Sequence, residues 1–300
     1  MKIRILLAVV AMLGISNIAM GDEVDSRFRV ARKYLDENNL TVTTTIDQAY
    51  VQDAILVVGE GLGKKGTVGA QKRLTAITAA KVAAQRRLAE LLHGVAVVSE
   101  TTVRDSELES DVIKTAVTGL VRGAQPVIQE YNEREETALV ILKVGMNGPR
   151  SFAATLYEKI LTEPKVRQEL EKPAYVPPVA DVAPAVAGSY DGLIIDATGY
   201  NFRPALINRI FNPRGEVLYD PAKISQKVLV EQGCGEYTNS VDKARAALGK
   251  RGVRNPLVVT AAGTVSPSDL QVADDMAAQI FAANQASGFM ADARVAFVLK

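Results

Sequence analysis

The feature that most constrains the fold of this chain is a helical pattern over residues 70–94, AQKRLTAITAAKVAAQRRLAELLHG. Gly94 marks the end of the pattern. Lys72, Arg86 and Arg87 lie opposite an apolar stripe, so we expect the helix to cover a sheet with one face and to meet water with the other. The stripe consists of Leu74, Ile77, Ala80, Ala84, Leu88 and Leu91.

Strand and helix patterns surround this helix in the first half of the chain. Val-rich and Ile-rich runs predict strands, and helical spacing predicts shorter helices. The expected elements are a weakly helical arm at 25–39, a strand at 49–61, a strand at 95–103, a helix at 108–124, a hairpin at 125–146 with its turn at 132–136, and a helical stretch at 150–171 that breaks at Pro164.

A proline-rich stretch, EKPAYVPPVADVAPAVAGS at 171–189, separates this half from a second one. Ser266 or Ser268 is available to cap the last helix of the second half. The expected elements there are a strand at 190–199, a hairpin at 203–220 turning at Pro213 and Gly215, helices at 221–232 and 239–249, a strand at 255–265, a helix at 266–284 and a strand at 293–300.

The order of these elements predicts an α+β fold, with two small mixed or antiparallel sheet domains that are each covered by helices. The expected division is a signal peptide at 1–21, an N-terminal arm at 22–49, a first domain at 50–170, a linker at 171–189 and a second domain at 190–300.

The N-terminus has the pattern of a secretory signal peptide. Lys2 and Arg4 precede an apolar run at 5–15, and a small-x-small site ends at Gly21. No cysteine comes directly after the apolar run, so we expect an exported, periplasmic chain without a lipid anchor.

Composition argues against several classes of protein. The chain has 35 Lys and Arg against 34 Asp and Glu, which does not favour nucleic acid as a partner. It has no Trp and only 5% aromatic residues, which disfavours sugar or base stacking. Cys234 is the only cysteine, so an intramolecular disulfide is impossible, and the sequence leaves open a buried thiol or a bridge between chains.

A glycine run, GLGKKGTV at 61–68, matches the dinucleotide-binding pattern G-x-G-x-x-G. A dinucleotide fold also needs an acidic residue about 20 positions further on, at the end of the next strand. The long helix reaches His93 and the next strand ends near Glu100, which is too far along the chain. The run therefore predicts a tight strand-to-helix connection that needs positive φ angles.

The remaining residues with chemical potential are scattered, and we expect no catalytic, cofactor-binding or metal-binding residues. His93 is the only histidine, at a helix C-terminus, and a hydrolase would have to join it to Ser99 and a distant carboxylate. The acidic segment 104–111 lacks EF-hand spacing and is interpreted as the approach to a helix N-terminus. Asp191 and Asp196 are expected on opposite faces of a strand.

The segment of about residues 50–147 resembles the Lpp-twenty family of outer-membrane lipoproteins. The resemblance rests on a strand that ends in G-x-G, on the helix containing AAKVAAQRRLAELLHG and on the order of the elements after it. The segment is also similar to the N-terminal domain of flagellar assembly protein T and to flagellar lipoprotein P. The resemblance implies a non-enzymatic envelope protein that helps to build flagellar basal-body rings or discs, with envelope or basal-body proteins as partners and homo-oligomerisation. Many members carry a lipid-anchored cysteine, which this chain lacks after its signal peptide.

Two interpretations of the function follow. The first is a periplasmic structural or assembly protein that associates with the outer membrane through its partners. The alternative is a periplasmic binding module for a small ligand or peptidoglycan, seated in a cleft between the two units.

Overall fold

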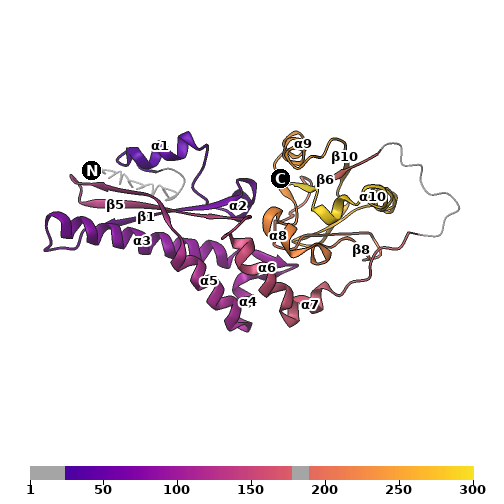
Figure 1. Ribbon diagram of the computed structural model, residues 1–300, viewed down its shortest axis with the longest axis horizontal. Helices are drawn as coiled ribbons and strands as arrows, with labels where there is room; N and C mark the ends of the chain where they lie inside the picture. The colour runs from indigo at the N-terminus through magenta and orange to yellow at the C-terminus, as the bar shows by residue number, and fades with distance from the viewer. Residues whose placement is uncertain (1–23, 178–188) are drawn as a thin grey trace, which may run out of the picture.

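The computed structural model describes residues 24–177 and 189–300, which form two units side by side (Figure 1). The expected signal peptide at 1–21 and residues 178–188 of the expected linker lie outside the described residues. Both units combine helices with small sheets, so the α+β class is confirmed.

The N-terminal unit is built on a three-stranded antiparallel sheet. Its strand order is β1 (Ala54–Leu62), β5 (Thr137–Gly145), β4 (Pro126–Asn132). Helix α3 (Gly69–His93) runs along one face of this sheet (Figure 1). The remaining elements are α2 (Ile46–Val51), β2 (Ala96–Val98), β3 (Thr101–Thr102), α4 (Val103–Glu109), α5 (Asp111–Gly123), α6 (Phe152–Thr162) and α7 (Pro164–Leu170).

The N-terminal arm covers the other face of the same sheet. Helix α1 (Arg29–Glu37) and Phe28, the residue before it, pack Phe28, Ala31 and Leu35 into a core that includes Leu56 and Ile141 of the sheet. The expected weakly helical arm is therefore one layer of a helix–sheet–helix sandwich, because its apolar residues meet the sheet face that α3 leaves open.

Close contact between β1 and α3 depends on two glycines. A β-carbon at Gly59 would lie 2.2 Å from the carbonyl oxygen of Ala80, and one at Gly61 would lie 2.3 Å from the Ala80 nitrogen. Helix α3 accordingly turns small residues toward the strand. Its fully buried residues are Ala76, Ala80, Ala84, Leu88 and Leu92.

The expected stripe on this helix is correct except at one end. Ala80, Ala84 and Leu88 are buried, whereas Leu74 is 65% exposed. The sequence pattern placed Leu74 in the core because leucine is apolar, but the glycine-bearing strand accepts the face that carries Ala76 instead.

The glycine run connects β1 to α3, as expected. Gly66 has a φ of +84° and Gly69 a φ of +53°, and no atom lies within 4 Å of a β-carbon placed at either residue. The prediction of a tight connection with positive φ angles is confirmed.

The C-terminal unit has two four-stranded sheets. The first is entirely parallel, with the order β10 (Pro256–Thr260), β6 (Gly192–Asp196), β13 (Val295–Val298), β9 (Glu236–Thr238). The second has the order β11-β12-β7-β8 and is mixed. The elements not yet bounded are β7 (Arg209–Phe211), β8 (Val217–Tyr219), η1 (Pro221–Lys223), α8 (Gln226–Gln232), α9 (Val241–Lys250), β11 (Gly263–Ser266), β12 (Asp269–Gln271), α10 (Asp274–Ser287) and η2 (Phe289–Asp292).

Several local expectations were wrong at their boundaries. Residues 49–51 end helix α2, which Thr45 begins with a capping box. The expected strand at 255–265 divides into β10 and β11, and the expected helix at 266–284 includes strand β12 before α10 begins at Asp274. Neither Ser266 nor Ser268 caps that helix, because it begins later in the chain with Ala273 at its N-cap position.

The acidic segment 104–111 was also misinterpreted. Most of it is helix α4, which starts at a capping box between Thr102 and Asp105. Asp111 alone lies in the first turn of α5, where Ser110 accepts from the Ile113 nitrogen.

A methyl group at Gly59 tests the close approach of β1 and α3. We expect Gly59→Ala to lower the free energy of unfolding by about 3 kcal/mol, because the added atom collides with helix backbone that has no rotamer with which to move away. Chemical denaturation followed by circular dichroism measures the change. Gly119→Ala is the matched control: it adds the same methyl group to α5 with nothing within 4 Å, and should leave stability unchanged or raise it by up to about 1 kcal/mol. Equal stabilities for the two variants would contradict this packing.

Candidate functional site

The two units are joined by backbone as well as side-chain contacts. The Leu206 and Ile207 nitrogens donate to the carbonyl oxygens of Ala96 and Val97, at 3.0 and 2.9 Å. Buried Tyr157 of α6 donates its hydroxyl to the Leu206 carbonyl at 2.7 Å. A single hydrophobic core runs through both units, so the junction is a packed interface.

A buried ion pair reinforces this junction. The Arg209 Nη2 atom lies 2.7 Å from Asp269 Oδ2, and the two residues are 2% and 1% exposed. The same Nη2 donates to Ser99 Oγ at 2.8 Å, and this hydroxyl donates to Asp269 at 3.0 Å. Arg209 Nη1 donates to the Glu169 carbonyl at 2.7 Å. Ser99 and Glu169 belong to the first unit, and the ion pair to the second, so the network spans the junction.

The hydrogen bonds of Ser99 and His93 argue against the hydrolase hypothesis, which needs these two side chains in contact. Ser99 Oγ is held by Arg209 and Asp269, whereas His93 Nε2 pairs with Glu107 Oε2 at 2.9 Å. No hydrogen bond joins Ser99 to His93 among the described residues, so the serine–histidine pair that this hypothesis requires is not assembled.

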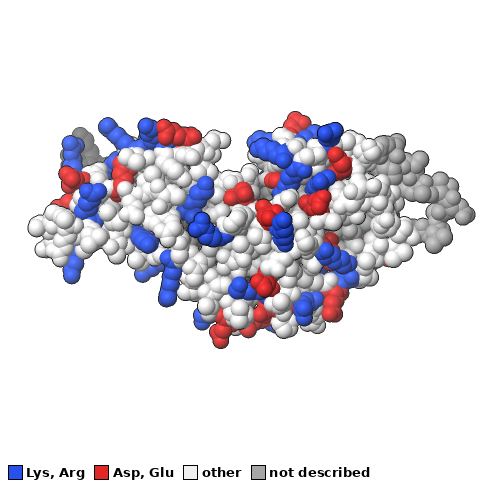
Figure 2. Space-filling view, in the orientation of Figure 1, with Lys and Arg blue, Asp and Glu red and all other residues white. Residues whose placement is uncertain are grey.

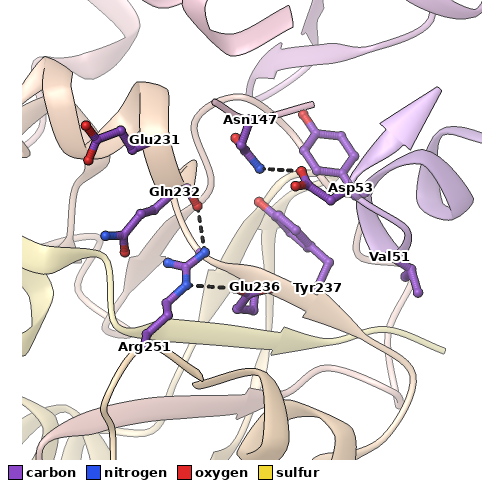
Figure 3. A pocket seen from close by; sticks show the side chains of 10 residues that line it. Val51, Asp53, Asn147, Glu231, Gln232, Glu236, Tyr237 and Arg251 are labelled. Atoms are coloured by element: carbon purple, nitrogen blue, oxygen red, sulfur yellow. Dashed lines mark hydrogen bonds and ion pairs between the residues drawn. The ribbon is translucent and has the colours of Figure 1, made fainter. Parts of the chain in front are cut away.

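A pocket of about 190 Å³ lies where the two units meet (Figure 3). The first unit contributes the end of α2, Asp53 shortly after it and a residue after β5. The second contributes the end of α8, the start of β9 and the residue after α9. The lining residues are Tyr50, Val51, Asp53, Asn147, Glu231, Gln232, Gly235, Glu236, Tyr237 and Arg251.

Arg251 organises the side of this pocket that belongs to the second unit. Its Nε atom lies 2.7 Å from Glu236 Oε1, and its two terminal nitrogens donate to the Gln232 and Ala293 carbonyls at 2.7 and 2.9 Å. On the opposite side, Asn147 donates to Asp53 Oδ1 at 2.8 Å. Figure 3 shows Asp53 and Asn147 facing Glu236 and Arg251 across the pocket.

Burial and neighbouring charge perturb two acidic groups here. Burial raises the pKa of the Asp53 carboxyl and the Glu236 charge raises it further, while the hydrogen bond from Asn147 and the Arg251 charge oppose the shift. Burial also raises the pKa of Tyr50 well above its usual value. The Tyr50 hydroxyl has no hydrogen-bond partner among the described residues, and its ring packs edge-on against Tyr237 at 4.8 Å.

A second concave surface lies between α3 and α5, with a volume of about 510 Å³. Val82, Ala89, Val117 and Val121 supply apolar lining, and the basic residues at its edge are Arg86, Lys114 and Arg122. It continues along α3 into a second depression of about 570 Å³, with which it shares Val82 and Arg86. We call this surface the α3–α5 groove.

The other residues singled out from the sequence have structural partners. Cys234 is 1% exposed and its sulfur lies 3.0 Å from the Tyr237 hydroxyl, so it is a buried thiol and burial raises its pKa. Asp191 accepts from the Arg254 and Asn255 nitrogens, and Asp196 accepts from the Thr198 nitrogen, so each carboxylate binds backbone of its own neighbourhood.

Residues 24–177 and 189–300 contain no group of three or more His, Cys, Asp or Glu side chains placed to hold a metal ion. Within the same ranges no helix is both long and apolar enough to cross a membrane.

Residues 192–300, which contain the parallel sheet, match the family described as the second domain of Treponema pallidum Tp0624. No curated protein matches the chain.

The perturbed pKa of Asp53 predicts how the stability of the protein depends on pH. Its pKa in the folded protein is raised above the unfolded value, so its contribution to stability is fully present below the unfolded pKa and is lost as pH rises through the folded pKa. Asn at this position keeps the oxygen that accepts from Asn147 and tolerates the positive φ of 52°. We expect Asp53→Asn to be more stable than the wild type at neutral pH, and the difference to shrink as pH falls toward 4. Thermal unfolding across pH measures both, and a difference that does not depend on pH would contradict the assignment.

Proposed function

We propose that this chain is a non-enzymatic, exported structural or assembly protein of the cell envelope that works through protein contacts. The α3–α5 groove carries the proposal, because an open apolar surface with basic edges suits a protein partner better than a small substrate. The signal-peptide pattern at 1–21 and the resemblance to the Lpp-twenty family support an envelope setting.

Within this proposal the protein acts in the periplasm, associates with the outer membrane through partners and forms homo-oligomers. A flagellar basal-body ring or disc is the assembly that the resemblance indicates. The match to the Tp0624 second domain is to a bacterial protein, which is compatible with this setting, and its description names no activity.

Cross-linking in intact cells tests the proposal. We expect the tagged mature chain to capture flagellar ring, rod or other envelope components. Val82→Lys, in the shared part of the α3–α5 groove, should reduce their recovery at least about tenfold, because a charge replaces apolar contact area. Val265→Lys, at an exposed position on β11, is the control and should not change it. Recovery that is the same for both variants would argue against this groove as the contact surface.

The pocket between the units supports the alternative, a small-ligand or peptidoglycan binding module. It is concave, lies at a domain junction and presents Asp53, Glu236 and Arg251, which are features of ligand sites. A screen of peptidoglycan fragments and small periplasmic solutes by thermal shift separates the two functions. If the alternative is correct, one ligand class raises the melting temperature saturably, and Asp53→Ala abolishes the rise. If no ligand class does so, the pocket is a packing feature of the junction.

A further inference from the structure

The helices of the N-terminal unit carry two surfaces of opposite character. The first is the α3–α5 groove, whose edge residues Arg86, Lys114 and Arg122 form no ion pair among the described residues. Helices α3 and α5 together contain seven Lys and Arg against two Asp and Glu. Figure 2 shows Lys and Arg side chains over these helices.

The second surface lies where α4 meets α5, and we call it the α4–α5 knob. Leu108, near the end of α4, is 80% exposed, and Val112, in the first turn of α5, is 60% exposed. Asp105 and Asp111 are exposed beside them, while Glu109 is paired with Lys165. Figure 2 shows acidic side chains at the lower tip of the unit, where α4 lies. Residues 103–112 contain four Asp and Glu against one basic residue, Arg104, so the knob offers exposed leucine and valine side chains within a mainly acidic surrounding.

We propose that the α4–α5 knob of one copy docks into the α3–α5 groove of a second copy, which rests on the proposed function as an assembly protein. The apolar lining of the groove receives Leu108, and its basic edge faces the acidic residues around the knob. The two surfaces are therefore complementary to each other in polarity and in charge.

The positions of the two surfaces on α5 fix the kind of assembly. Val112 and Val121 are nine residues apart, which is two and a half helical turns, so they project from opposite sides of the helix. One copy therefore uses its groove toward one neighbour and its knob toward another. Such a head-to-tail contact produces rings or filaments, in contrast to a twofold dimer in which the same patch meets itself.

Light scattering coupled to size-exclusion chromatography tests the proposal on the mature chain. We expect the wild type to form oligomers whose mass rises with concentration. Leu108→Lys places a cation on the knob, where it meets the basic groove, and Val82→Lys places one inside the groove. Each variant alone should be a monomer. Val265→Lys, with the same change at an exposed site on β11, should behave as the wild type.

The decisive result comes from mixing the two variants in equal amounts. Val82→Lys retains its knob and Leu108→Lys retains its groove, so one productive contact forms, and the complex ends there because two lysines meet at the other contact. We expect a species of twice the monomer mass and nothing larger. Circular dichroism and thermal melting confirm that both variants are folded.

A monomeric wild type, oligomers that survive both substitutions, or folded variants whose mixture stays monomeric would each overturn this inference. These outcomes are measured on the purified chain, and they are distinct from the capture of envelope components by the wild-type chain in cells. The envelope assignment can therefore stand when self-association fails, and self-association can stand when no envelope component is captured.

Discussion

The arrangement of the two units depends on the buried pair of Arg209 and Asp269. A charge removed from water costs several kcal/mol unless its partner and the remaining hydrogen bonds are in place. Here both carboxylate oxygens and all three guanidinium nitrogens have partners, and two of those partners, Ser99 and the Glu169 carbonyl, come from the other unit. Separating the units would leave these charges without part of their surroundings, so the ion pair favours one relative position.

The neighbouring contacts act in the same direction. The backbone hydrogen bonds between residues 96–97 and 206–207 and the buried hydroxyl of Tyr157 leave little freedom at the junction. The first residues of the expected linker also hold the units together. Tyr175 is buried, and its backbone N–H donates a hydrogen bond to the Val217 carbonyl.

The sequence predicted what depends on local periodicity and turn chemistry. The long helix, the hairpin at 125–146, the break at Pro164 and the turn at Gly215 all follow from apolar spacing or from residues with restricted backbone angles. The sequence wrongly predicted that Leu74 is buried, because leucine is apolar. Gly59 and Gly61 of the facing strand have no side chains, so the strand packs against the small residues of α3. Glycines at alternate positions of a strand were the signal for this close contact.

The site could not be predicted in the same way. Ser99 and Arg209 are 110 residues apart, and Arg209 and Asp269 are 60 apart, so no local pattern joins them. Asp269 was assigned to a helix because SPSD resembles a capping sequence, although its segment pairs in parallel with β7. The pocket residues also come from separate segments that only the packing of the two units brings together.

The central claim is that the two units form one rigid body, and a distance distribution between them tests it most directly. Spin labels at Thr78→Cys on α3 and Arg245→Cys on α9 occupy exposed positions in different units, and Cys234 is buried and therefore protected from labelling. Double electron–electron resonance on the doubly labelled chain, diluted with excess unlabelled chain so that distances between copies do not contribute, should give one narrow distance distribution. A broad or two-peaked distribution would contradict the rigid junction.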